Sequence, residues 1–81
     1  MSTKDNEHPN EILTERELEV LVALASGEET AEIARRTGRS VSTVAAQRQS
    51  LCAKLGLNNL AELTVYALSW QLIPAPKIKN K

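Results

Sequence analysis

The sequence predicts an all-α fold, and three observations carry that prediction. The 81-residue chain has only three glycines, three prolines and no phenylalanine, a composition that favours helices over strands. Its apolar residues recur at helical spacing, as in the segment from Leu18 to Ala25. The apolar segments are bounded by residues that cap, end or break helices. We therefore expect four helices in one small domain over residues 13–73.

A capping box marks the start of the first predicted helix. In this motif the Thr14 hydroxyl accepts a backbone N–H, and the Glu17 carboxylate accepts the N–H of the cap residue. Gly27 ends the helix. Residues 1–12, which include Pro9 and several acids, are expected to form a flexible acidic N-terminal tail.

The second and third predicted helices are joined by a short turn. The second covers about residues 30–37, has no good cap at its start, and ends at a glycine. The third is capped by Ser40 or Ser42 and runs to Leu55, where another glycine follows. Two short helices joined in this way describe a helix-turn-helix, which presents the outer face of its second helix to the major groove of DNA.

The fourth predicted helix opens at Asn59, which has Glu62 three residues later, as in a capping box. It continues to about Leu72, because the prolines that follow break the chain. Residues 74–81 are expected to form a flexible C-terminal tail.

The outer face of the third predicted helix is small and nearly uncharged. Residues 42–56 read STVAAQRQSLCAKLG, and Val44, Leu51 and Leu55 form the stripe expected to be buried. The opposite face consists of Ala, Gln and Ser, where a surface helix usually carries Lys and Glu. Because small side chains let a helix backbone approach closely, this face suggests that something large lies flat against it.

The formal net charge is zero, yet the charges are unevenly distributed along the chain. Residues 1–32 carry nine of the ten acids, and residues 33–56 carry none. The cations of the acid-free segment are Arg35, Arg36, Arg39, Arg48 and Lys54. This distribution favours a nucleic-acid partner, although the neutral charge of the whole chain does not.

Several short runs together resemble the LuxR/NarL-type DNA-binding domain. They are LTERELEVL at 13–21, EIARR at 32–36, TV at 43–44, KLG at 54–56 and AEL at 61–63. The resemblance extends without gaps from Leu13 to about Ile73. It implies a four-helix domain whose third helix reads the major groove and whose fourth helix commonly forms a dimer. The run RSVSTVAAQRQS at 39–50 is similar to the capsule-synthesis regulator branch of this family.

The resemblance implies three base contacts on the third helix, at Ala45, Ala46 and Gln49. A glutamine can hydrogen-bond an adenine, and an alanine can contact a thymine methyl group. The alternative is that these are ordinary exposed helix residues.

Phosphate contacts are expected from both helices of the helix-turn-helix. Hydroxyl groups at the start of the third helix lie where free N–H groups and the helix dipole attract phosphate, although capping would explain one of them. The resemblance implies a backbone contact for the lysine of the last turn, whose alternative role is to complement the dipole. With the outward arginines of the second helix, the set is Ser40, Ser42, Thr43, Lys54, Arg35 and Arg36. Arg48 is instead expected to point back and pair with a glutamate of the first helix.

The fourth predicted helix is apolar on more than one side. The residues that suit the core are Leu60, Leu63, Ala67 and Trp70. A neighbouring stripe at i, i+4, i+7 and i+11 consists of Ala61, Val65, Leu68 and Leu72. A wide buried face is one explanation for the stripe. We favour a homodimer surface, because a two-fold dimer would place two recognition helices about one DNA turn apart.

Other site classes are not expected. One histidine, one cysteine and dispersed carboxylates form no credible catalytic or metal site, and no cofactor is expected. The apolar runs are too short to cross a membrane, and the N-terminus lacks the apolar core of an export signal. A single cysteine fits a reducing cytoplasm.

We therefore expect a cytoplasmic, sequence-specific transcription regulator that binds double-stranded DNA as a dimer. Family members end response regulators and quorum-sensing receptors, and a few stand alone, so the chain is either free-standing or the output domain of a longer regulator. The alternative is a protein-interaction module that pairs with a related regulator through the fourth helix and binds DNA poorly by itself. The zero net charge favours the alternative, and so does Ala45, because the family that the chain resembles usually has a lysine or another long polar residue at that site.

Overall fold

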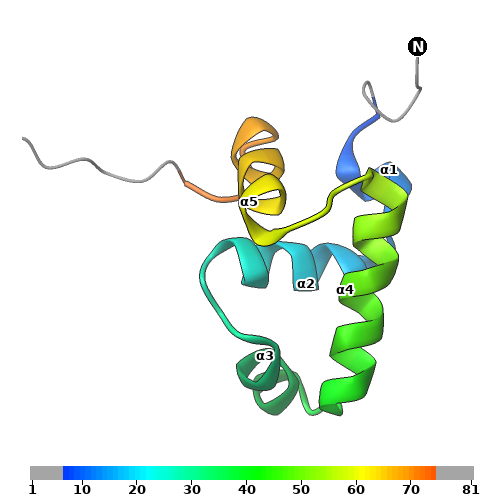
Figure 1. Cartoon of the computed structure of the whole chain (residues 1–81), viewed down its shortest axis with the longest axis vertical. Coiled ribbons are helices and arrows are strands. Elements are labelled where there is room, and N and C mark those ends of the chain that lie inside the picture. Colours follow the sequence, from blue (N-terminus) through cyan, green and yellow to red (C-terminus); the bar gives the residue numbers. More distant parts are fainter. Residues whose placement is uncertain (1–6, 75–81) are drawn as a thin grey trace, which may run out of the picture.

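The computed structural model describes residues 7–74 and is all-helical over that range. Its elements are α1 (Pro9–Ile12), α2 (Glu15–Ala25), α3 (Thr30–Thr37), α4 (Val41–Leu55) and α5 (Leu60–Ser69) (Figure 1). The predicted all-α fold is confirmed for this part of the chain. The four expected helices are α2 to α5, and the structure adds the short α1.

Helix α2 lies at the centre of the molecule. The other four helices all contact it, and α3 also packs against α4 (Figure 1). Side chains that are inaccessible to solvent meet between these helices, and the largest of them are Leu21, Ile33, Leu51, Leu63, Val20 and Val44. One small core therefore holds α4 against α2 and α3, as the helix-turn-helix prediction requires.

Local signals account for the start and end of α3. Its last turn ends at Gly38, whose φ of 72° is a left-handed conformation that glycine adopts without strain. At its start, the Glu32 carboxylate accepts the Glu29 backbone N–H at 2.8 Å. An acid in the first turn thus replaces the side-chain cap that the sequence lacks, and it also suits the positive end of the helix dipole.

The predicted flexible tail over residues 1–12 is wrong for Pro9–Ile12, which form α1. A proline at the first helical position has a suitable φ and lacks an N–H that would otherwise be unsatisfied. Pro9 is buried and Ile12 packs against the core. The sequence shows the proline but not this burial, which depends on neighbours far along the chain. Residues 1–6 lie outside the described residues.

The start of α1 also contacts the end of α5. The His8 side chain accepts the Asn10 N–H at 3.1 Å, and its ring lies edge-on to Trp70 with centroids 5.3 Å apart. Edge-to-face aromatic pairs of this kind are favourable. Contacts between residues so far apart in sequence make α1 part of the folded domain.

Helix α5 ends at Ser69, three residues earlier than predicted. Gln71 has a φ of 58°, so the chain turns out of the helical path there. The Leu72 N–H then donates to the Ala67 carbonyl at 2.9 Å, and Leu72 packs against the core. Of the predicted C-terminal tail, only Pro74 lies within the described residues.

The packing of α1 predicts a stability effect for Ile12→Ala. Because Ile12 is half-buried against the core, we expect the free energy of unfolding to fall by about 1–2 kcal/mol. Glu11→Ala, at the exposed neighbouring position, should change it by less than about 0.5 kcal/mol. Urea unfolding followed by circular dichroism measures both. Equal, negligible effects would mean that α1 contributes nothing to the fold.

Candidate nucleic-acid interface

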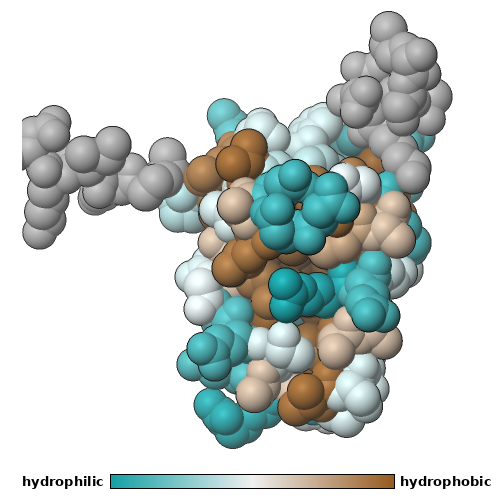
Figure 2. Space-filling view, viewed as in Figure 1, coloured by the Kyte–Doolittle hydropathy of each residue, from teal (hydrophilic) through white to brown (hydrophobic). Residues whose placement is uncertain are grey.

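The exposed face of α4 carries all three residues predicted to contact bases. Ala45, Ala46 and Gln49 are exposed, whereas Val44 and Leu51 on the opposite side are buried. Figure 2 shows pale residues, interrupted by hydrophilic ones, along the right-hand edge of the molecule, where α4 lies. The structure therefore brings the three residues together on one accessible surface, and their contact with bases stays a prediction.

Three hydroxyl groups gather at the N-terminus of α4. Ser40 is the cap, because its Oγ accepts the Thr43 N–H at 3.1 Å. The same oxygen donates to Thr43 Oγ1 at 2.8 Å and lies 3.2 Å from Ser42 Oγ. All three residues are exposed at the positive end of a 15-residue helix. This arrangement is compatible with the phosphate contacts predicted for them.

Lys54, another predicted phosphate contact, also has a structural role. Its Nζ donates to Glu17 Oε1 at 2.7 Å, and its side chain remains 39% exposed. An ammonium has three donors, so one ion pair leaves donors available for a phosphate. The alternative role expected for this lysine was to complement the helix dipole, but its bond to Glu17 depends on the packing of α4 against α2.

The Glu17 carboxylate joins the start of α2 to the C-terminal half of α4. It accepts the Thr14 N–H at 2.9 Å, which completes the predicted capping box, and it accepts hydrogen bonds from Ser50 and Lys54. Burial by itself raises the pKa of a carboxyl group. Here the bonds from Lys54, Ser50 and Thr14 outweigh burial and lower the pKa of Glu17 from 4.5 to about 2.

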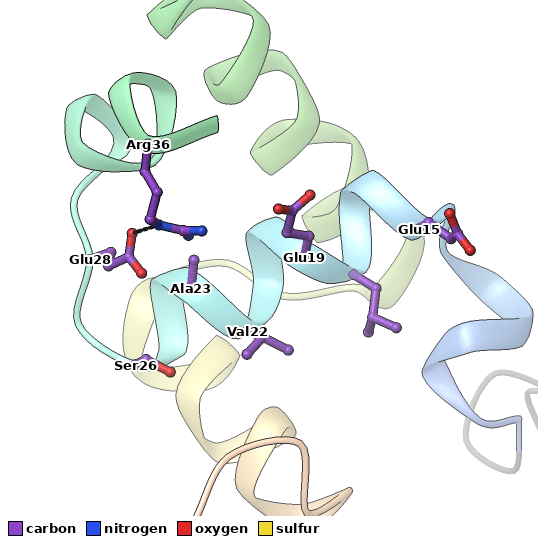
Figure 3. A pocket seen from close by; sticks show the side chains of 8 residues that line it. Glu15, Glu19, Val22, Ala23, Ser26, Glu28 and Arg36 are labelled. Carbon is purple, nitrogen blue, oxygen red and sulfur yellow. Dashed lines mark hydrogen bonds and ion pairs between the residues drawn. The ribbon is translucent and has the colours of Figure 1, made fainter. Parts of the chain in front are cut away.

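The arginines of the turn region are used differently from one another. Arg36 Nε donates to Glu28 Oε1 at 3.0 Å, and Figure 3 shows the two side chains pointing toward each other. Arg35 is exposed and forms no ion pair within residues 7–74. Of the two arginines predicted to contact phosphate, only Arg35 is therefore without a carboxylate partner in this part of the chain.

The prediction that Arg48 pairs with a glutamate of α2 is wrong. Arg48 is exposed and makes no ion pair with any described residue. Two α2 carboxylates are already engaged, since Glu17 bonds to Lys54 and Glu19 accepts from Arg39 at 2.8 Å. Helical spacing predicted that Arg48 points back toward the protein, but its side chain is exposed on the flank of α4 that faces residues 57–59 and not α2.

The stripe predicted for a dimer does not form one continuous helical face. Ala61 and Val65 are exposed, the latter by 65%, and Leu68 is half-buried. Leu72 lies beyond the end of α5 and packs against the core. Leu60, predicted to be in the core, is instead 48% exposed. The exposed apolar residues of α5 are therefore Leu60, Ala61 and Val65, and Figure 2 shows hydrophobic surface at the upper end of the molecule, where α5 lies.

The described residues carry neither a metal-ligand cluster nor a membrane-spanning helix. In residues 7–74 no group of three or more His, Cys, Asp or Glu side chains could hold a metal ion. Over the same range, no helix has both the length and the apolar character needed to cross a bilayer.

Comparison with known proteins identifies one family. Its family model, GerE, described as "Bacterial regulatory proteins, luxR family", matches residues 11–67. This range contains α2, α3, α4 and most of α5.

The chain is also similar to named bacterial proteins. It is 41% identical over 71 residues to the oxygen regulatory protein NreC of Staphylococcus aureus, in strains bovine RF122 / ET3-1, MRSA252 and JH9. The match covers 88% of this chain and 33% of each relative, so the chain spans about a third of the length of these proteins. The similarity of residues 39–50 to the capsule-synthesis branch stays a prediction.

The bonds of Glu17 predict a pH-dependent stability difference between the wild type and Glu17→Gln. The folded pKa of about 2 lies below the ordinary value of 4.5, so the carboxylate stabilises the fold fully above pH 4.5. This stabilisation, roughly 3 kcal/mol from the size of the shift, is lost as the pH falls through 2. Denaturant unfolding should show the difference at pH 7 and its decline as the pH falls from about 4.5 to 2.

Glu15→Gln is the matched control for this experiment. Glu15 is exposed on the same helix and forms no ion pair within the described residues. Its substitution should change the free energy of unfolding by less than about 0.5 kcal/mol at any of these pH values. A Glu17→Gln difference that does not depend on pH would contradict the assignment of the stabilisation to the charged carboxylate.

Proposed function

The chain belongs to the LuxR family of bacterial regulatory proteins, and from this we propose that it is a sequence-specific transcription regulator, or the output domain of one, that docks α4 in the major groove of DNA as a dimer. The family consists of transcription regulators with a DNA-binding domain and not of enzymes. We place its action in the cytoplasm, on double-stranded DNA and without a cofactor.

The exposed face of α4 carries this proposal. Ala45, Ala46 and Gln49 offer no bulky or acidic side chain that would keep the helix away from base edges. In a helix-turn-helix, the second helix of the motif enters the major groove, and α4 has that position after α3. Gln49 is the side chain of this face best suited to recognise a base, through paired hydrogen bonds to adenine.

The phosphate contacts would lie around this face. The hydroxyl cluster of Ser40, Ser42 and Thr43 is exposed at the N-terminus of α4, and Arg35 on α3 has no carboxylate partner within residues 7–74. Lys54 would share its ammonium between Glu17 and a phosphate. Arg36 would have to leave Glu28, or act while paired with it. Such contacts orient the domain without reading sequence.

A dimer through α5 would use its exposed apolar residues, Leu60, Ala61 and Val65, together with the half-buried Leu68. Exposed Leu and Val side chains on neighbouring turns of one short helix favour a partner surface. The surface is small, so we expect weak self-association in solution that is reinforced when both half-sites of an operator are bound.

The second candidate is a protein-interaction module that pairs with a related regulator through α5 and binds DNA weakly by itself. The observation in its favour is that Arg36, Arg39 and Lys54 each bond to a glutamate. A gel-shift series with random and genomic duplexes at low and moderate salt separates the two candidates. If the chain binds DNA by itself at moderate salt, the first candidate is supported. If it binds DNA at low salt only after a second regulator is added, the second candidate is supported.

Gln49→Ala tests base recognition. At the preferred site we expect a loss of about 1–3 kcal/mol in binding free energy, because a bidentate base contact is removed. Binding to random duplexes should change little, since phosphate contacts carry that binding. Gln71→Ala, the same substitution at an exposed position beyond α5, is the control and should leave binding to both duplexes unchanged. Equal losses for Gln49→Ala on preferred and random DNA would remove Gln49 from base recognition.

Val65→Glu tests the dimer. A carboxylate on an apolar dimer surface would be desolvated without a partner, so cooperative binding to a two-site operator should be abolished. Because Val65 is 65% exposed, helical content and the binding of one half-site should be retained. Val65→Thr, which keeps the shape without a charge, should retain most of the cooperativity. If Val65→Glu leaves cooperativity intact, the dimer does not use this surface.

A further inference from the structure

The exposed face of α4 lies between two shallow depressions, one on each flank. The depression on the α2 side is lined by Thr43, Ala46, Gln47 and Ser50 and by the residues 14–17 at the start of α2. The depression on the other side is lined by Ala45, Arg48, Gln49 and Cys52 and by the residues 57–59 that follow α4. Successive residues of a helix are rotated by 100°, so Ala45 and Gln49 border one flank while Ala46 and Ser50 border the other.

Each depression contains one arginine. Arg16, at the start of α2, lines the first, and Arg48 lines the second. Both are exposed, and neither forms an ion pair with any residue between 7 and 74. A guanidinium has five N–H donors and is always charged, which makes it well suited to bind phosphate oxygens.

Three other cations near α4 are used inside the fold, whereas Arg35 has no carboxylate partner within residues 7–74 and lines neither depression. Arg36, Arg39 and Lys54 donate to Glu28, Glu19 and Glu17, respectively, at 3.0, 2.8 and 2.7 Å. These ion pairs leave Arg16 and Arg48 as the unpaired cations that line the two flanks of α4 within the described residues.

The carboxylates around the two arginines differ. The second depression is lined by no carboxylate, and Asn58 and Asn59 are its polar residues beyond α4. The first is lined by Glu15 and Glu17 beside Arg16. The charge of Glu17 is compensated by Lys54 and by the Ser50 and Thr14 donors, which leaves Glu15 as the one uncompensated acid of that depression. The N-terminal N–H groups of α2 add partial positive charge at the same place.

We propose that Arg16 and Arg48 bind phosphates of opposite DNA strands, one on each side of α4. A helix in the major groove lies between the two sugar–phosphate backbones, and contacts to both fix its position in the groove. This inference rests on the proposed function, and it adds Arg16, which belongs to neither helix of the helix-turn-helix.

The hydrogen bonds of Glu17 would fix the position of Arg16 relative to α4, and therefore relative to Arg48. Arg16 directly precedes Glu17, whose carboxylate bonds to Ser50 and Lys54 of α4. Arg16 therefore keeps a constant place beside α4, although it is carried by another helix. A phosphate bound by Arg16 would therefore lie at a fixed distance from the bases that α4 faces.

The first test measures how binding to a short random-sequence duplex depends on salt. Arg16→Ala and Arg48→Ala should each reduce the slope of log affinity against log salt by about 0.9, and the double variant by about 1.8. Arg16→Lys and Arg48→Lys should keep most of the slope. Gln71→Glu changes the net charge by the same amount as each alanine variant but lies after α5, so its slope should equal that of the wild type. An unchanged slope in either alanine variant overturns the proposal for that arginine, and an equal loss in Gln71→Glu overturns it for both.

The second test assigns the strands. It uses a single half-site duplex, selected by the wild-type chain from a random pool, with methylphosphonates replacing the phosphates that flank the site on one strand at a time. The wild type should lose affinity for both modified duplexes. Because the other phosphate contacts remain, Arg16→Ala should respond less strongly than the wild type to modification of one strand only, and Arg48→Ala less strongly to modification of the other. A weaker response to the same strand in both variants overturns the proposal.

These results are distinguishable from a failure of the proposed function. If the wild-type chain binds no duplex, or binds without salt dependence, docking of α4 is contradicted and this inference with it. If the wild type shows a steep slope that neither alanine variant changes, DNA binding stands and only the roles of Arg16 and Arg48 are overturned.

Discussion

The position of α4 depends on the buried carboxylate of Glu17. A charged group removed from water is strongly destabilising unless donors replace the water, and here a backbone N–H, the Ser50 hydroxyl and the Lys54 ammonium do so. These bonds keep the carboxyl group ionised at neutral pH, with a pKa of about 2. They form only when α4 lies against α2 in one register, because Ser50 and Lys54 are one helical turn apart and must both reach the same carboxylate. Leu51, which lies between Ser50 and Lys54 in the sequence, is buried in the core, and its burial agrees with that register.

This register determines which side of α4 is left for a partner. With Val44 and Leu51 buried and Ser50 and Lys54 turned toward Glu17, the small side chains of the helix remain outside. The same helix therefore uses one side for the fold and the other for the proposed DNA contact. Its only last-turn cation, Lys54, belongs to both, because a single ammonium can donate to Glu17 and to a phosphate at once.

The tertiary ion pairs decide which cations of this chain, whose net charge is zero, are left without a carboxylate partner in the described residues. Arg36 and Arg39 come from the acid-free segment of the sequence, but they reach Glu28 and Glu19, which precede that segment. The pair of Arg36 and Glu28 cancels charge on the side of α2 and α3 shown in Figure 3, where Glu19, the partner of Arg39, also lies. Arg48, which the acids of α2 do not reach, remains exposed on α4. The packing of the helices, and not the composition of the chain, therefore determines which charged side chains stay unpaired at the surface of the described residues.

The sequence by itself determined the features that act over a few residues. The capping box at Thr14, a serine cap at position 40 or 42 and the glycine after α3 mark helix boundaries, because each signal bonds or bends the chain locally. The family motif extended this to the fold and the face of α4. Only the tertiary structure decided the rest. The ordering of α1, the return of Leu72 to the core and the partners chosen by each arginine all require groups distant in sequence to meet. Helical spacing gives the direction in which a side chain leaves its own helix axis. Burial and ion pairing depend also on the position of the neighbouring helix, which is set only when the chain has packed.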